Sequence, residues 1–225
     1  MFDGDKGQYG NYYYKLNDAY VEILVEKIAD LFDIKHAHYY PVKNNNQEYY
    51  LSKDLNCFGK FVLAEDLGIN SNNIYEIINT IKSKYPIDYD NLEYEFIKMF
   101  FMDLLILNID RSNTNYGFLT TNGKTSLYIL DNELSFLDTK SYMTSLDNNP
   151  KGNSLLEIEN ILNNFPTNYI DLFQEMVDKL DIETLDNLFK ETESIIKQEL
   201  PHKNSYLKRY DLLRWRIKEK KLVLN

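Results

Sequence analysis

Residues 107–118 of the chain read LNIDRSNTNYGF, and residues 131–133 read DNE. A step of five residues from Asp110 to Asn115 on a loop, followed by a hairpin that returns Asp131, is the spacing used by kinase catalytic loops. Asp131 and Asn115 offer the carboxylate and amide oxygens that Mg²⁺ prefers. Asp110 is then free to accept the proton of an attacking hydroxyl. This stretch therefore predicts phosphoryl transfer that depends on ATP and Mg²⁺.

Spacing alone supports this prediction only weakly, because Asp and Asn are common in loops. The elements expected on either side of the stretch strengthen it. Residues 92–107 are apolar almost all round, as expected of a helix buried at the centre of a lobe. Residues 116–120 and 126–130 predict a small hairpin around an Asn-Gly turn. The candidate loop thus follows a buried helix, and Asp131 ends the partner strand of the hairpin.

The N-terminal part predicts a small sheet that carries one helix. Three glycines between residues 4 and 10 predict a flexible turn, and residues 12–16 predict a strand. Apolar side chains then recur at helical spacing as far as Phe32. Two aromatic-rich runs, at 38–42 and 48–51, predict a hairpin that closes on three asparagines.

The C-terminal part is predicted to be mainly helical from about Asn56 onward. Beyond the small hairpin, residues 138–153 predict a polar loop, and amphipathic helices are expected near 168–180, 182–199 and 204–221. This order predicts an α+β, protein-kinase-like fold with two lobes. Residues 1–56 would form a reduced N-terminal sheet lobe that ends at a hinge, and residues 57–225 a helical C-terminal lobe with the catalytic and metal-binding loops.

Composition restricts the classes of partner. The net charge of -10 disfavours direct binding of nucleic acid by the whole domain. A single cysteine, Cys57, excludes an internal disulfide and a cysteine-based zinc cluster. The histidines, His36, His38 and His202, show no metal-ligand spacing. Residues 97–107 form the longest apolar stretch and are too short for a transmembrane segment. With no leader sequence evident, we expect a cytoplasmic protein.

The candidate loop resembles the catalytic loop of HipA-family serine/threonine kinases, and is most similar to the small CtkA-like members. Their pattern is Asn-x-Asp-Arg-His-x-x-Asn-Trp-Gly-Phe-Leu. By this resemblance Asp110 is the catalytic base, and Asn115 and Asp131 are magnesium ligands. The resemblance covers most of the chain, although only this loop has the specificity of a motif.

The resemblance also implies a nucleotide-binding set. Lys15 resembles the strand lysine that contacts the phosphates and pairs with a helix glutamate. Glu22 is favoured as that glutamate, with Glu26, one helical turn further on, as the alternative. Residues 52–55 resemble the hinge that receives adenine, which implicates Lys53 and Leu55.

Two features depart from the family pattern. Ser112 replaces the family histidine, a position that also differs in type II phosphatidylinositol 4-kinases, whose loop is more distantly similar. Only fourteen residues precede Lys15, too few for a complete first strand, glycine loop and second strand. Either the N-terminal glycines form a reduced phosphate cover, or a partner completes the lobe.

Three functional hypotheses follow. The first is a protein serine/threonine kinase of HipA-like type, the toxin of a toxin–antitoxin pair. The resemblance implies a protein substrate such as a translation factor or an aminoacyl-tRNA synthetase, and an antitoxin as partner. The second is a phosphoinositide kinase, suggested by Asp110-Arg111 and by residues 131–136. The overall acidity argues against it, whereas the basic segment near 204–221 leaves it open. The third is a catalytically weak pseudokinase that acts as a binding module.

Overall fold

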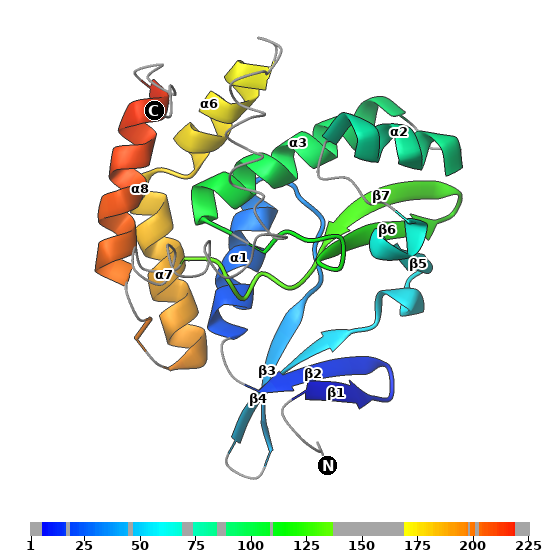
Figure 1. The fold of residues 1–225 in the computed structure, drawn as a ribbon. Helices are drawn as coiled ribbons and strands as arrows, with labels where there is room; N and C mark the ends of the chain where they lie inside the picture. Colours follow the sequence, from blue (N-terminus) through cyan, green and yellow to red (C-terminus); the bar gives the residue numbers. More distant parts are fainter. Residues whose placement is uncertain are drawn as a thin grey trace.

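The computed structural model describes residues 6–16, 19–44, 47–68, 74–84, 89–108, 110–136, 169–197, 199–200 and 203–218. Strands with one helix among them come first, and helices with an inserted hairpin follow, which is close to the predicted order (Figure 1). In chain order the elements are β1 (Lys6–Tyr9), β2 (Tyr12–Leu16), α1 (Ala19–Leu31), β3 (Tyr39–Asn44), β4 (Gln47–Lys53), β5 (Lys60–Leu63), α2 (Ile74–Lys84), α3 (Tyr89–Ile106), β6 (Tyr116–Thr121), β7 (Lys124–Ile129), α6 (Ile170–Lys179), α7 (Ile182–Ile196) and α8 (Lys203–Lys218). The loop predicted at 138–153 lies outside the described residues.

The N-terminal sheet is antiparallel, with the strand order β1-β2-β4-β3. It includes a strand where the sequence predicted only a flexible glycine turn, so that prediction is wrong for residues 6–9. Gly7 pairs with Tyr14 across β1 and β2, and a Cβ atom at Gly7 would lie 2.6 Å from the Tyr14 hydroxyl oxygen. Gly7 therefore permits the close approach of the Tyr14 ring, whereas Gly10, with φ +59°, makes the turn.

The second sheet has the order β5-β6-β7. The β6–β7 hairpin is confirmed, with positive φ at Asn122 and Gly123, as a type I′ turn requires. The expectation of helix from Asn56 onward is wrong for β5, which pairs with β6. Gly117 makes this pairing feasible, because a Cβ atom there would lie 2.6 Å from the Val62 carbonyl oxygen and 2.4 Å from the ring of Phe61.

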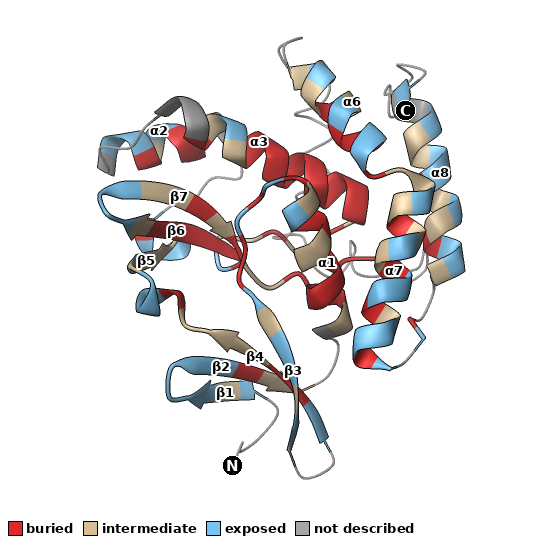
Figure 2. Ribbon diagram, turned by 180° about the vertical axis from the view of Figure 1, so that it is seen from behind, coloured by how far each residue is buried: buried red, intermediate tan, exposed pale blue. Residues whose placement is uncertain are grey.

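The helices surround a continuous hydrophobic core. The central helix α3 is buried almost all round, as predicted, and Figure 2 shows it as the most continuously buried helix. The helices α6, α7 and α8 lie close to the predicted ranges. Asp181 caps α7 by accepting a hydrogen bond from the Thr184 N–H at 2.7 Å. In the described part of the chain, every helix is too short or too polar to cross a bilayer.

The helix α1 connects the N-terminal sheet to the helical part. Its apolar face, which includes Val25 and Ile28, joins the common core, and it packs against α7. Lys27 on α1 also pairs with Glu191 on α7, with 2.8 Å between Nζ and Oε2. The segment after α1 then forms a parallel bridge between His36 and Ile129, at the end of β7. The segment after α1 thereby reaches the end of β7.

Candidate active site

The candidate catalytic loop begins where α3 ends. Asn108 donates its backbone N–H to the Asp103 carbonyl oxygen at 2.9 Å and its side-chain amide to the Asp103 carboxylate at 3.1 Å. Its amide oxygen accepts the backbone N–H of Asp110 at 3.1 Å. A single asparagine thus ends the helix and fixes the direction in which the chain enters residue 110.

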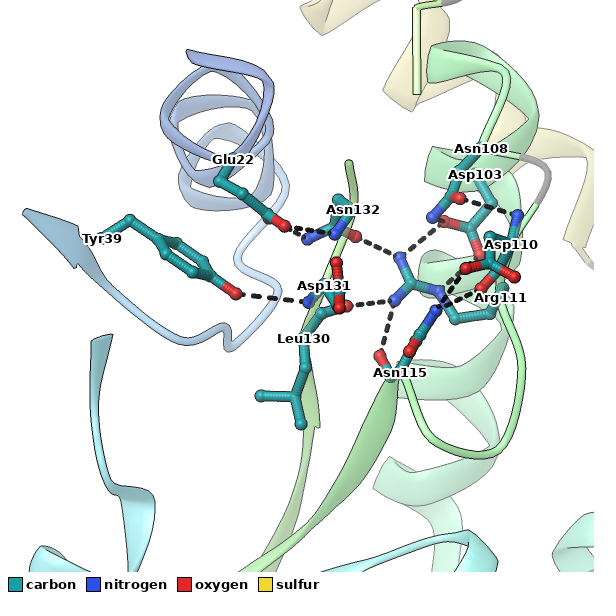
Figure 3. A network of polar contacts seen from close by, with 10 residues as sticks. All are labelled: Glu22, Tyr39, Asp103, Asn108, Asp110, Arg111, Asn115, Leu130, Asp131 and Asn132. Carbon is teal, nitrogen blue, oxygen red and sulfur yellow. Dashed lines mark hydrogen bonds and ion pairs between the residues drawn. The ribbon is translucent and has the colours of Figure 1, made fainter. Parts of the chain in front are cut away.

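Arg111 is the centre of the loop (Figure 3). Its guanidinium binds both carboxylate oxygens of Asp103, with 2.9 Å from Nε and 2.8 Å from Nη2. Nη1 donates to the carbonyl oxygens of Asn115 at 2.7 Å and Leu130 at 2.9 Å, and Nη2 donates to the Asn132 amide oxygen at 2.5 Å. One side chain therefore ties α3, the candidate loop and the segment after β7 together.

The Arg111–Asp103 ion pair is fully buried, with 0% exposure of both side chains. Burial on its own disfavours the cation, but the adjacent Asp103 carboxylate outweighs it and holds the pKa of Arg111 above its ordinary value. The bidentate geometry gives the pair strong, directional hydrogen bonds. Arg111 is therefore a permanently charged, buried residue whose hydrogen bonds hold the segments of the site together.

Asn115 lies against Asp110. Its side-chain amide nitrogen donates to the Asp110 carbonyl oxygen at 2.5 Å and to Oδ2 of the carboxylate at 3.1 Å. Its own carbonyl oxygen accepts the N–H of Leu130 at 2.9 Å, so Asn115 stands next to the residue before Asp131. The structure thus brings the three predicted residues, Asp110, Asn115 and Asp131, to one place.

Asp131 has an unusual backbone conformation for a residue with a side chain, with φ +40°. Such left-handed conformations are uncommon outside glycine and persist where surrounding contacts hold them. Here the Asp131 N–H donates to the Tyr39 hydroxyl oxygen at 3.2 Å. The carboxylate oxygen Oδ1 lies 3.0 Å from Nζ of Lys15.

Lys15 pairs with two carboxylates of the 131–133 segment. Besides Asp131, it contacts Glu133, with 2.5 Å between Nζ and Oε2. Partial burial lowers the pKa of Lys15, but the hydrogen bond with Glu133 and the charge of Asp131 raise it above the ordinary value. The lysine remains a cation aimed at the candidate metal ligand.

The predicted ion pair between Lys15 and Glu22 is absent from the ion pairs of the described residues. Glu22 is instead buried and accepts hydrogen bonds from Asn132, at 2.7 Å from the backbone N–H and 3.1 Å from the side-chain amide. Asn132 donates both of these hydrogen bonds to Glu22, and Glu133 pairs with Lys15 instead of Glu22. The correction concerns the partner of Lys15, since Glu22 still faces the site.

The alternative glutamate, Glu26, points elsewhere. Its carboxylate contacts His38, with 2.8 Å between Oε1 and Nδ1, and accepts the backbone N–H of Tyr39 at 3.0 Å. Glu26 therefore contacts the segment between α1 and β3, whereas Glu22 contacts Asn132 in the candidate active site.

A cavity of about 770 Å³ lies between the N-terminal sheet and the candidate loop. This volume is within the range of small-molecule sites. The predicted hinge residues Lys53 and Leu55 lie in its wall, and Lys15, Glu22 and Asp131 line it as well. Its lining also includes a strip of β1, residues 6–8. Partly apolar walls with a lysine and an aspartate suit a nucleotide and its cation.

Glu22 predicts a pH dependence of stability in the absence of nucleotide and magnesium. Burial, followed by the charge of Asp131, raises the pKa of Glu22 from its ordinary value of 4.5 to about 7. The folded state therefore holds this proton more tightly than the unfolded state. Stability should fall as pH rises between 4.5 and 7, by about 3 kcal/mol from this group alone.

Urea unfolding at a series of pH values measures the effect. Glu22→Gln, which cannot ionise, is expected to lose this part of the pH dependence. Asp131→Asn is expected to reduce it, because the charge of Asp131 contributes to the shift. Equal slopes in the parent protein and Glu22→Gln would contradict the prediction.

Several residues of the site were not predicted from the sequence. Arg111 lies in the motif at 107–118 without a predicted role, and Asp103 lies in the apolar stretch at 97–107 without one. Glu133, Asn132 and Tyr39 were not assigned. The usable signal was Asp103, because a carboxylate inside an otherwise apolar helix needs a buried partner.

Comparison with known proteins shows similarity in structure rather than in sequence. No family model matches the chain, and no curated protein matches it. The chain is similar in structure to the Helicobacter pylori proinflammatory kinase CtkA, with a TM-score of 0.57 and 18% identity, over 96% of this chain and 90% of that one. It is also similar to HipA of the Shewanella oneidensis MR-1 toxin–antitoxin system, solved with HipB and operator DNA.

The match to HipA has a TM-score of 0.52 and 10% identity, and covers 94% of this chain but 58% of the HipA chain. At such low identities, the two matches establish the fold alone. The fold is that of HipA-like kinases, as the sequence resemblance implied. The comparisons lend no support to the more distant resemblance to phosphatidylinositol 4-kinases.

Proposed function

We propose that the chain is an ATP- and Mg²⁺-dependent kinase that phosphorylates a serine or threonine hydroxyl of a protein. The observation that carries the proposal is that Asp110 and Asn115 lie against each other close to Asp131, which lines a cavity of about 770 Å³ together with Lys15. Phosphoryl transfer requires positioning and charge stabilisation rather than covalent help from the protein, and these residues offer both.

Asn115 and Asp131 would hold Mg²⁺, because together they offer a neutral oxygen and a carboxylate, and Lys15 would neutralise phosphate charge. When bound, Mg²⁺ and ATP supply the transferable phosphoryl group and shield its charge. Asp110 orients the acceptor hydroxyl and takes its proton. The Asn115 amide holds the Asp110 carboxylate through the 3.1 Å hydrogen bond, which restricts the orientation of this base.

The N-terminal hairpin favours an enzyme over a pseudokinase. The strand β1 supplies residues 6–8 to the cavity wall, so the chain itself covers part of the cavity. This reduces the need for a partner that completes the lobe. By analogy with HipA, we propose that the acceptor belongs to the translation machinery, a translation factor or an aminoacyl-tRNA synthetase, and that an antitoxin controls the activity.

Labelling with radioactive ATP tests the proposal. We expect Mg²⁺-dependent transfer to protein in the parent chain. Asp131→Asn should lose Mg²⁺-dependent nucleotide binding, because it removes the carboxylate that faces both Lys15 and the candidate cation. Asp171→Asn, an exposed aspartate on α6, is the matched control and should bind and transfer like the parent chain.

The same assay separates the alternatives when mixed lipid vesicles are offered beside candidate proteins. Label on lipid instead of protein would identify a phosphoinositide kinase. Tight Mg²⁺–ATP binding without transfer would identify a binding module. Nucleotide binding that is equal in Asp131→Asn and Asp171→Asn would exclude the proposed metal site.

A further inference from the structure

We infer that Glu26, His36 and His38 form a binding site for a transition-metal ion, with Zn²⁺ as the expected occupant. The site is separate from the candidate magnesium ligands and needs no nucleotide. One ligand atom from each of the three side chains can be chosen so that all lie within 4.8 Å of one another. The sequence spacing gave no sign of this cluster, because Glu26 comes from α1 and the histidines from the segment that follows it.

The geometry of the cluster is close to that of a zinc site. Zinc binds histidine nitrogen and carboxylate oxygen at about 2.0–2.2 Å, so tetrahedral ligands stand roughly 3.3 Å apart. The pair of Glu26 Oε1 and His38 Nδ1 is already at 2.8 Å. All separations lie within 4.8 Å, so a modest contraction of the cluster would bring the three ligand atoms to tetrahedral spacing.

The Glu26 carboxylate is already oriented. Its second oxygen accepts the backbone N–H of Tyr39 at 3.0 Å, which leaves Oε1 directed at His38. Hydrogen bonds of this kind are common at ligating carboxylates, where they fix the orientation of the ligand. The first ligand is therefore preorganised by the backbone of β3.

His36 supplies independent support. Its side chain is only 5% exposed, Nδ1 lies 3.0 Å from the Ala37 carbonyl oxygen and Nε2 lies 3.0 Å from Oδ1 of Asp30. A neutral imidazole has one N–H and can donate to only one of two oxygens. Its other nitrogen then faces an oxygen, and this contact is favourable only when that nitrogen carries a second proton or binds a metal ion. A metal ion in the cluster fulfils this requirement.

Asp30 completes the surroundings. It lies four residues after Glu26 on α1, and therefore on the same helix face. Its contact with His36 Nε2 makes it the carboxylate that orients the imidazole ring. Two imidazoles with carboxylates suit Zn²⁺ better than Mg²⁺ or Ca²⁺, which prefer oxygen ligands alone.

An ion here would join the two segments that contact residues 131 and 132. Glu22, one turn before Glu26 on α1, binds Asn132, and Tyr39, next to His38, binds the Asp131 N–H. The metal would connect α1, through Glu26, to the residue just before β3, through His38. It would thereby stabilise the conformation in which both segments contact the end of β7.

Titration of the full chain with Zn²⁺, after treatment with a chelator and without nucleotide, tests the inference. We expect one ion per chain by calorimetry, and with Co²⁺ the visible absorption of a low-coordinate site. At 100 times the dissociation constant, Zn²⁺ should raise Tm by about 5–10 °C. His38→Ala and Glu26→Gln should each weaken Zn²⁺ binding by about tenfold or more.

Glu48→Gln is the matched control, because Glu48 is an exposed carboxylate on β4 that pairs with Lys43. It should bind Zn²⁺ like the parent protein. The His38 side chain is 57% exposed, so the His38→Ala variant is expected to fold like the parent protein. A parent protein that binds no Zn²⁺, or equal affinities in Glu26→Gln, His38→Ala and Glu48→Gln, would overturn the inference. These results are distinguishable from loss of kinase activity, because no phosphoryl transfer is measured.

Discussion

Replacing Asp110 with asparagine is expected to lower the rate of phosphoryl transfer by about 10²–10⁴, the usual contribution of a general base. Asparagine keeps the shape of the side chain, and its amide oxygen can still accept the hydrogen bond that Asn115 donates to Oδ2 at 3.1 Å. The loop should therefore keep its structure and lose only the proton acceptor. Single-turnover kinetics with saturating Mg²⁺–ATP measure the effect.

Nucleotide affinity provides the internal control for this substitution. Because Asp110 is assigned to the acceptor hydroxyl rather than to the cation, Asp110→Asn should bind Mg²⁺–ATP as tightly as the parent chain. The contrast with Asp131→Asn, which should lose this binding, separates the two carboxylates by role. Unchanged turnover in Asp110→Asn would remove the assignment of Asp110 as the base.

Asp103→Ala is expected to destabilise the protein by about 3–5 kcal/mol, because removing one partner of a buried ion pair leaves the other charge uncompensated. The Arg111 guanidinium has no exposure in the side chain, so water cannot replace the lost carboxylate. For a chain of this size the loss corresponds to a decrease in Tm of roughly 6–20 °C. Urea unfolding followed by fluorescence gives the free energy directly.

An exposed ion pair is the appropriate comparison. Glu175 and Lys179 form an i,i+4 pair on α6 with 2.8 Å between Oε1 and Nζ, and both side chains are about half exposed. Exposed pairs contribute little to stability. Glu175→Ala should therefore leave the unfolding midpoint essentially unchanged. If Asp103→Ala also left the unfolding midpoint unchanged, the buried Arg111–Asp103 pair would not stabilise the protein as its contacts indicate.

Local patterns in the sequence predicted those parts of the fold that depend on neighbouring residues. The apolar helix α3, the amphipathic helix α1 and the Asn-Gly hairpin of β6 and β7 all follow from side-chain spacing and turn chemistry. Two strands were missed for different reasons. The strand β1 is short and polar, and β5 is only four residues long and pairs with a strand more than fifty residues away.

The contacts of the candidate site likewise fall into those that local sequence predicts and those that depend on distant packing. The grouping of Asp110, Asn115 and Asp131 could be predicted because a short loop and one hairpin connect them. The pairing of Lys15 with Glu133 instead of Glu22 could not be predicted. Glu22 contacts Asn132, which lies 110 positions away, and this contact depends on how α1 packs. The cluster of Glu26 with the two histidines spans only twelve positions, but it depends on how the chain turns back after α1, which residue spacing does not show.

The packing of α1 against α7 has a consequence for shortened versions of the protein. All of the residues assigned to the candidate active site lie before residue 137, yet the helix that carries Glu22 is supported by a helix that begins at Ile182. A gene interrupted between these points would still encode every assigned active-site residue. Its product would lack the surface on which α1 rests, so an intact motif in a fragment would be poor evidence of a working protein.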